Sequence, residues 1–201
     1  MYIVCLDMEG VIVPEIWIAF SEKSGIPELS ITTRDEPDYD KLMRYRLKVL
    51  REHGCTIRDI QNTIAEIEPL PGAVEFMNKL RENGQAVVVS DTFTQFAMPL
   101  MAKFGYPTLF CNELVIGPDG MIVDFKMRTE HSKLTTVKAL QSIGYKVIAI
   151  GDSYNDLEML RRAEVGFLFK STPAIRAENS DLKAYENFGD LYAAICRTEE
   201  Q

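Results

Sequence analysis

The chain has 201 residues, 46% of them hydrophobic and 26% charged, which is the balance of a water-soluble globular protein. Its formal net charge of −8 argues against a nucleic-acid partner, because a phosphate backbone needs a basic surface to bind. No apolar run approaches the length of a membrane span, so we expect no membrane partner either. The length fits one domain with an insertion and is sufficient to bury a substantial core.

The four cysteines, Cys5, Cys55, Cys111 and Cys196, are scattered and form no C-x-x-C pair. This pattern favours free thiols in a reducing compartment over a disulfide framework or a zinc site. A strand is predicted from residue 2 onward, so we expect no signal peptide before it. The predicted location is the cytoplasm.

The first predicted strand covers residues 2–6, a run of apolar and β-branched residues that is typical of a strand buried on both faces. Two acids, Asp7 and Glu9, follow it directly, and Gly10 comes next. The carboxyl ends of parallel strands are where open α/β sheets bind their ligands. Taken alone, this short pattern is equally compatible with a turn carrying solvated acids.

A helical block follows the first strand. Helices are predicted over 15–25 and 38–52 and from Thr56 to Ile67, with an irregular segment over 30–37 between the first two. No strand pattern occurs between residues 14 and 70. We therefore predict that 14–70 is an inserted helical cap that projects over the ends of the strands.

From Pro71 onward, helical and strand patterns alternate. The pattern predicts helices over 72–83, 94–104, 132–143 and 155–163, and strands over 86–91, 146–152 and 165–169. Two more strands are predicted within 108–127, with a turn at residues 117–120. Helical segments are predicted from residue 170 to the C-terminus. Such alternation implies a parallel sheet covered by helices on both faces. The predicted fold is an α/β, Rossmann-like core formed by residues 1–13 and 71–201.

Each of the three buried strands is followed by polar groups, and in a parallel sheet these groups meet at one edge. They are Asp7 and Glu9, then Ser90 and Asp91, then Asp152 in a turn that also holds Asn155 and Asp156. Several carboxylates in one pocket repel one another and need a cation. An all-oxygen site of this kind suits Mg²⁺. Lys133, before the third strand, could neutralise the remaining charge and hold a phosphoryl oxygen.

Four stretches stand out: Asp7-x-Glu9-Gly10-Val11, the hydrophobic strand ending in Ser90, Lys133, and Gly151-Asp152-x-x-Asn155-Asp156. In this order they resemble the four motifs of the haloacid dehalogenase-like hydrolase superfamily, and the helical insertion is similar to the cap of its phosphoserine phosphatase branch. One residue departs from the common pattern, because most phosphatases of the superfamily have Asp where this chain has Glu9. That change resembles the bifunctional phosphoserine phosphatase/homoserine phosphotransferase group, as do the segments 14–20 and 37–40.

The resemblance implies a role for each matching residue. Asp7 is expected to be the nucleophile that forms an aspartyl-phosphate, and Glu9 the acid that protonates the leaving serine and then activates the second nucleophile. Mg²⁺ is expected to bind the Asp7 carboxylate, the Glu9 carbonyl and Asp152. The expected phosphate ligands are Ser90, the backbone amide of Asp91, Lys133 and Asn155, with Asp156 as an outer-shell partner of metal or lysine. In the cap, Glu15 is expected to meet the ammonium of phosphoserine or homoserine, and Arg46 the carboxylate.

Three alternatives remain open from the sequence. Glu15 could serve only the dipole of its helix, and Arg46 could lie on a solvated basic face. A phosphatase for another small phosphomonoester would need neither residue. A receiver-type signalling module also combines acids, a hydroxyl residue and a lysine around an aspartyl-phosphate, but its lysine follows the phosphorylated strand. The oligomeric state, monomer or homodimer, is not determined.

Overall fold

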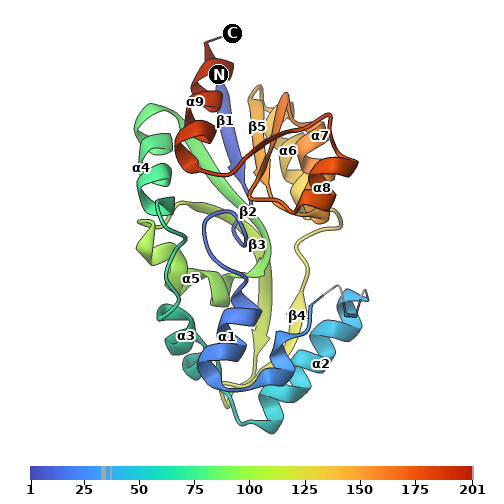
Figure 1. Ribbon diagram of the computed structural model, residues 1–201. Coiled ribbons are helices and arrows are strands. Elements are labelled where there is room, and N and C mark those ends of the chain that lie inside the picture. Colours follow the sequence, from blue (N-terminus) through green and yellow to red (C-terminus); the bar gives the residue numbers. More distant parts are fainter. Residues whose placement is uncertain (33–34, 37, 201) are drawn as a thin grey trace.

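A seven-stranded sheet forms the centre of the computed structural model (Figure 1), which describes residues 1–32, 35–36 and 38–200. Residues 33, 34 and 37, in the segment expected to be irregular, and residue 201 lie outside this part. The strand order is β4-β3-β2-β1-β5-β6-β7, and all neighbours are parallel except β3 and β4. The strands are β1 (Tyr2–Leu6), β2 (Gln85–Phe93), β3 (Thr108–Ile116), β4 (Ile122–Lys126), β5 (Lys146–Gly151), β6 (Val165–Phe169) and β7 (Lys183–Tyr185). The predicted α/β fold with a parallel core is confirmed.

Strand β1 lies at the middle of the sheet because its side chains can be buried on both faces. Val4 and Leu6 belong to one hydrophobic core, and Ile3 and Cys5 to another on the opposite face, as the alternation of side chains along a strand requires. The strand pairs in parallel with both β2 and β5. The amide of Asp7 extends this pairing by donating to the carbonyl of Ile150 at 2.9 Å.

Helices cover both faces of the sheet (Figure 1). On one face lie α4 (Ala73–Asn83) and α9 (Phe188–Glu199), and on the other α6 (Ser132–Ser142), α7 (Leu157–Arg162) and α8 (Pro173–Glu178). In the described part of the chain, no helix combines the length and the apolar character that crossing a membrane requires.

The insertion between β1 and α4 folds as helices in its described part: α1 (Ile16–Ser24), the short 3-10 helix η1 (Pro27–Ser30), α2 (Tyr39–Glu52) and α3 (Ile57–Ala65). With α5 (Thr94–Lys103) and the β3–β4 hairpin, they occupy the end of the molecule toward which β1 and β2 run (Figure 1). The Trp17 ring packs edge-on against Phe96 of α5, with 5.0 Å between the ring centres. Tyr39 packs in the same way against Phe125 of β4, with 6.2 Å between the ring centres. The division into a cap at 14–70 and a core stays a prediction.

Three elements differ from the sequence prediction. Strand β7 lies where the sequence predicts helical segments, because three residues at the sheet edge, two of them exposed and one half-buried, carry no periodic signal. Strand β2 runs on to Phe93 through a bulge, beyond its expected end at Asp91. The helix expected over 155–163 is divided into η2 (Tyr154–Asp156) and α7, because Asp156 turns back to bond the backbone at the start of the turn.

Candidate active site

A pocket lies where the carboxyl ends of β1, β2 and β5 meet, as the sequence predicts. The described residues that line it are Asp7, Glu9, Glu15, Ser90, Asp91, Lys133, Asp152, Ser153 and Asn155. These side chains come from five separate segments, and the parallel sheet brings them together at one edge. Of the predicted site residues, Arg46 and Asp156 are not among the described residues that line the pocket.

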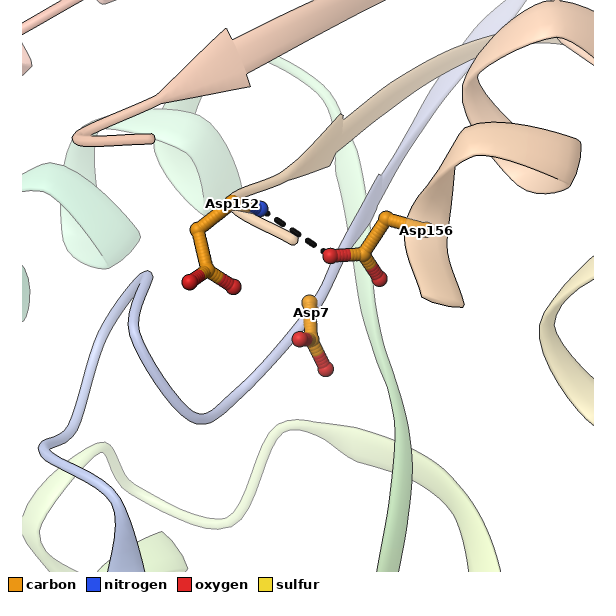
Figure 2. A group of neighbouring side chains, drawn as sticks. All are labelled: Asp7, Asp152 and Asp156. Atoms are coloured by element: carbon orange, nitrogen blue, oxygen red, sulfur yellow. Dashed lines mark hydrogen bonds between the residues drawn. The ribbon is translucent and has the colours of Figure 1, made fainter. Parts of the chain in front are cut away.

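Three carboxylates form a compact group at the end of β1 and after β5 (Figure 2). One oxygen each of Asp7, Asp152 and Asp156 lies within 4.8 Å of the others. Asp156 is fully buried, and protein donors already engage both its oxygens: Oδ1 accepts from Lys133 at 2.7 Å, and Oδ2 accepts from the Asp152 amide at 3.0 Å. Asp7 and Asp152 are therefore better placed than Asp156 to bind a cation directly.

Gly10 brings the turn after β1 against Asp152. Its φ of 77° lies in the left-handed region, and a Cβ atom on it would lie 2.5 Å from the carboxyl carbon of Asp152. Only glycine permits this approach. Two carboxylates and a nearby backbone turn provide the hard oxygen donors that Mg²⁺ prefers, so the residues present fit the predicted ion.

Lys133, in the first turn of α6, is buried among carboxylates. Its Nζ lies 2.9 Å from Oδ1 of Asp7, 2.7 Å from Oδ1 of Asp156 and 3.7 Å from Oδ2 of Asp91. Burial lowers the pKa of this amine, but the negative charges of Asp156 and Asp7 outweigh it and hold the pKa well above its usual value. Lys133 therefore remains a cation over the whole physiological range.

Two of the carboxyl groups that face the pocket, those of Asp7 and Asp152, have raised pKa values. Burial raises the pKa of Asp7 well above its usual range, and Asp156 adds to this, while Lys133 opposes it. Burial raises the pKa of Asp152 to about 7, again with a contribution from Asp156. A site that disfavours ionised carboxylates in this way binds either protons or a cation.

Glu9 connects the end of β1 to the first helix of the insertion. Its Oε1 accepts from the backbone amide of Ile16, the first residue of α1, at 2.8 Å. Glu15, at the N-cap position, makes no side-chain cap bond, so Glu9 supplies the acceptor that this helix end needs. Burial and the neighbouring charge of Glu15 raise the pKa of Glu9 to about 7. A carboxyl group that titrates near neutrality is suited to general acid–base catalysis.

Ser90 and Asp91 lie in an irregular part of β2. The pairing with β3 shifts between Val89, which lies opposite Phe110, and Phe93, which lies opposite Asn112. Three residues of β2 therefore span the distance of a single residue on β3, which bends the strand and redirects their side chains. The bulge places Ser90, which is 1% exposed, and Asp91 at the pocket.

Arg46 is only 5% exposed, so it does not lie on a solvated face. Its Nη2 donates to the carbonyl of Ile31 at 2.7 Å, and its guanidinium lies 4.4 Å from the centre of the Trp17 ring. The buried Nε has no partner among the described residues. Burial lowers the pKa of Arg46 to about 10, against the opposing effects of nearby groups that include Glu9 and Glu15. Arg46 is thus a buried cation that interacts electrostatically with two pocket residues, Glu9 and Glu15.

Three residues near the site are not among the site residues predicted from the sequence. The Ser132 hydroxyl donates to Oδ1 of Asp91 at 2.7 Å, and the Asn112 amide donates to the Asp91 carbonyl at 2.9 Å. The Tyr39 hydroxyl lies 3.5 Å from the same carbonyl. The position of Ser132 beside Lys133 could have indicated its proximity. Nothing in the sequence pattern distinguishes Asn112. Tyr39 belongs to the segment 37–40 that carries the resemblance, but the sequence predicts no role at the site for it.

Comparisons with known proteins agree with this geometry. The family model described as haloacid dehalogenase-like hydrolase matches residues 3–164. Phosphoserine phosphatase ThrH of Pseudomonas aeruginosa is 50% identical over 191 residues, which cover 95% of this chain and 93% of the relative. A phosphoserine phosphatase of Pseudomonas syringae pv. tomato is 48% identical over 189 residues, which cover 94% of this chain and 80% of that relative. The crystal structure of a phosphoserine phosphatase in apo form has a TM-score of 0.74 at 20% identity and covers 92% of this chain and 94% of that chain, which shows a shared fold.

Proposed function

The chain belongs to the haloacid dehalogenase-like hydrolase family, and we propose that it is a Mg²⁺-dependent phosphoserine phosphatase that also transfers the phosphoryl group to homoserine. The observation that carries this proposal is the buried contact between Asp7 and Lys133, 2.9 Å apart at the end of β1. It pairs a nucleophile with a permanent cation inside a pocket of phosphate-binding donors. The substrate follows from the relative named phosphoserine phosphatase ThrH, with which the chain shares 50% identity.

In this proposal the Asp7 carboxylate, the Glu9 carbonyl and Asp152 would hold Mg²⁺, and Asp156 would be an outer-shell partner. The ion supplies positive charge that stabilises the phosphoryl oxygens as negative charge develops on them. The close approach of Gly10 to Asp152 supports this set of ligands. So does the engagement of both Asp156 oxygens by protein donors.

The reaction proceeds in two displacements at phosphorus. A carboxylate oxygen of Asp7 attacks the phosphorus atom, the bond to the serine oxygen breaks, and Glu9 gives its proton to that oxygen. The product is an aspartyl-phosphate on Asp7 and free serine. Glu9 then removes a proton from water or from the homoserine hydroxyl, which attacks phosphorus and releases Asp7. Phosphate or phosphohomoserine leaves, and Glu9 is again protonated.

Recognition divides between the sheet edge and the insertion. Ser90, the amide of Asp91, Asn155 and Lys133 hold the phosphoryl oxygens. From the cap at 14–70, Glu15 meets the substrate ammonium and Arg46 its carboxylate. The unpartnered Nε of Arg46 supports the last role, because it leaves a buried cationic donor for an acidic group.

The proposed setting is the cytoplasm, and the small molecules phosphoserine and homoserine are the proposed partners, with the protein as a monomer or a homodimer. Membership in a hydrolase family removes the receiver-type alternative. A phosphomonoester without an amino-acid head group would leave Glu15, a pocket residue, without a substrate group to bind.

The test is to incubate the protein with phosphoserine and Mg²⁺, with and without homoserine, and to quantify serine, phosphate and phosphohomoserine. Homoserine should divert phosphoryl groups, so that phosphate falls below serine and phosphohomoserine accounts for the difference. If phosphate always equals serine, the protein is a hydrolase without transferase activity. If no serine is released, the proposed substrate is wrong.

A further inference from the structure

The carboxylate of Asp91 lies in the pocket but is not part of the group of acids that fits a cation. Asp7, Asp152 and Asp156 already provide that group. A further negative charge beside a phosphoryl site opposes binding of a phosphate dianion by Coulomb repulsion. The question is therefore what the Asp91 side chain contributes in return, beyond the backbone amide considered above.

Both oxygens of this carboxylate are engaged by residues from other segments of the site. Oδ1 accepts from the hydroxyl of Ser132 at 2.7 Å, and Oδ2 accepts from the amide of Asn155 at 3.1 Å. Lys133 forms a longer ion pair with the same carboxylate, with its Nζ 3.7 Å from Oδ2. Asp91 thus connects β2 to the start of α6 and to the turn after β5.

The backbone of Asp91 is fixed as well. Its carbonyl accepts from Asn112, which is fully buried on the neighbouring strand, at 2.9 Å. The Tyr39 hydroxyl, from helix α2, lies 3.5 Å from the same atom. A carboxylate that projects from so firmly held a backbone has a defined direction and can serve as a rigid acceptor.

Asn155 gains most from this arrangement, because it is itself exposed. The Ser153 hydroxyl donates to its Oδ1, and its Nδ2 donates to Asp91. With the oxygen and one N–H group of the planar amide anchored, the direction of the second N–H group is fixed too. Without Asp91, the Asn155 amide would lose the contact that determines where this second donor points.

We propose that the Asp91 side chain is a positioning residue, which orients the amide of Asn155 toward the phosphoryl group. The inference rests on the proposed function only in assuming that the pocket binds phosphate. Preorganised donors bind an anion more tightly than mobile ones, because their ordering cost is already met in the free protein. The gain in orientation outweighs the repulsion from the added charge.

The test measures binding of inorganic phosphate by titration calorimetry in the presence of Mg²⁺, for the wild type and for Asp91→Ala, Asp91→Asn, Asn155→Ala and the double variant Asp91→Ala/Asn155→Ala. Asp124→Asn, which removes an exposed charge on β4, is the control. We expect Asp91→Ala to weaken phosphate binding about tenfold. Asp91→Asn should retain part of the affinity, because its amide oxygen can still accept from Asn155.

The double variant separates positioning from a merely structural role. If Asp91 acts through Asn155, adding Asp91→Ala to Asn155→Ala should weaken phosphate binding by less than about threefold. Equal losses in both backgrounds would overturn the proposal, as would tighter phosphate binding by Asp91→Ala, since repulsion alone predicts tighter binding. If Asp91→Ala does not fold, the same cycle with Asp91→Asn decides between these outcomes.

Phosphate binding does not require turnover, so failure of this inference can be distinguished from failure of the proposed function. A wild-type protein that binds phosphate with Mg²⁺ but does not hydrolyse phosphoserine would contradict the proposed substrate. The phosphate affinities of the four variants would still decide the role of Asp91. Conversely, active wild-type protein with additive losses in the cycle would overturn only the role of Asp91.

Discussion

Asp7 shows how burial and charge combine at a single residue. Burial disfavours its ionised form, yet Lys133, 2.9 Å away, provides a compensating cation that is itself held by Asp156. Removing one partner from such a buried pair leaves an uncompensated charge and is strongly destabilising, whereas the intact set fixes each member in place. The nucleophile proposed here is therefore positioned by electrostatics rather than by flexible contacts.

Gly10 permits a prediction about metal binding. Gly10→Ala adds a Cβ that would lie 2.5 Å from the carboxyl carbon of Asp152, so this carboxylate must move. We expect the affinity for Mg²⁺ to fall at least about tenfold, since ion binding requires a specific ligand geometry. The measurement is a Mg²⁺ titration followed by calorimetry and by phosphoserine turnover.

The matched control is Gly25→Ala at the C-cap of α1. Gly25 has a similar φ of 70°, but a Cβ there would meet nothing within 4 Å. This variant should lose only about 1 kcal/mol of stability from the left-handed backbone and keep its affinity for Mg²⁺. Equal Mg²⁺ affinities for Gly10→Ala and the wild type would show that Asp152 does not depend on this close approach.

At the scale of elements, a hydrogen bond ties helix α1 to the turn that follows β1. Glu9 accepts from the amide of Ile16, so the proposed acid and the first helix of the insertion share a contact. Arg46 of α2 packs on Trp17 of α1, and this stacks two helices of the insertion beside the site. The insertion therefore holds the Glu9 side chain through α1 and a buried cation, Arg46, through the contact between α1 and α2.

Arg46→Ala should weaken the recognition of phosphoserine far more than that of a phosphomonoester without a carboxylate. Loss of a charge-assisted contact to a buried partner typically costs about 2–5 kcal/mol, which would appear as a lower kcat/KM for phosphoserine. Because Arg46 also contacts Ile31 and Trp17, the variant will lose stability too. Comparing the two substrates on the same variant removes this structural effect. Equal losses for both substrates would assign Arg46 to structure alone.

The main strands and helices could be predicted because burial leaves a clear pattern in the sequence. The run before Asp7 and the run at 146–151 are apolar on both faces, and only a central parallel strand accommodates that. Short or irregular features carry no such pattern. Strand β7 has three residues, and the bulge at Ser90 and Asp91 depends on how β3 pairs with β2.

For the site, the motifs along the chain indicated most of the residues that line the pocket, because each motif ends a strand or begins a helix, but they did not indicate Ser153. Contacts between segments could not be read in this way. The burial of Arg46 depends on Trp17 and Ile31, which are 29 and 15 residues away in sequence. The contacts of Asp91 depend on four separate segments.

At the scale of the whole molecule, the acidic site makes stability depend on pH and Mg²⁺ together. Asp7, Glu9 and Asp152 all have pKa values raised in the folded protein, those of Glu9 and Asp152 to about 7. The folded state therefore keeps protons that the unfolded chain releases at lower pH. This stability is present below the unfolded pKa values and is lost as pH rises toward the folded ones.

We expect the Tm of the metal-free protein to fall between about pH 5.5 and about pH 8, because the folded acids ionise over this range. Mg²⁺ competes with protons for the same carboxylates, so it should raise the Tm more at the higher pH. Thermal unfolding at both pH values, with Mg²⁺ or a chelator, provides the measurement. Asp152→Asn should remove most of the Mg²⁺ effect. A Mg²⁺ shift that is the same at both pH values would contradict this account.

The most direct test of the central claim is to trap the phosphoryl group on Asp7. The protein is mixed with phosphoserine and Mg²⁺, quenched in acid during turnover, digested, and analysed by peptide mass spectrometry. We predict one phosphoryl group on the peptide that contains Asp7. We also predict its absence in Asp7→Asn, whose phosphoserine turnover should be lower by about a thousandfold or more. Turnover of Asp7→Asn at the wild-type rate, or a trapped phosphoryl group on another residue, would contradict the account.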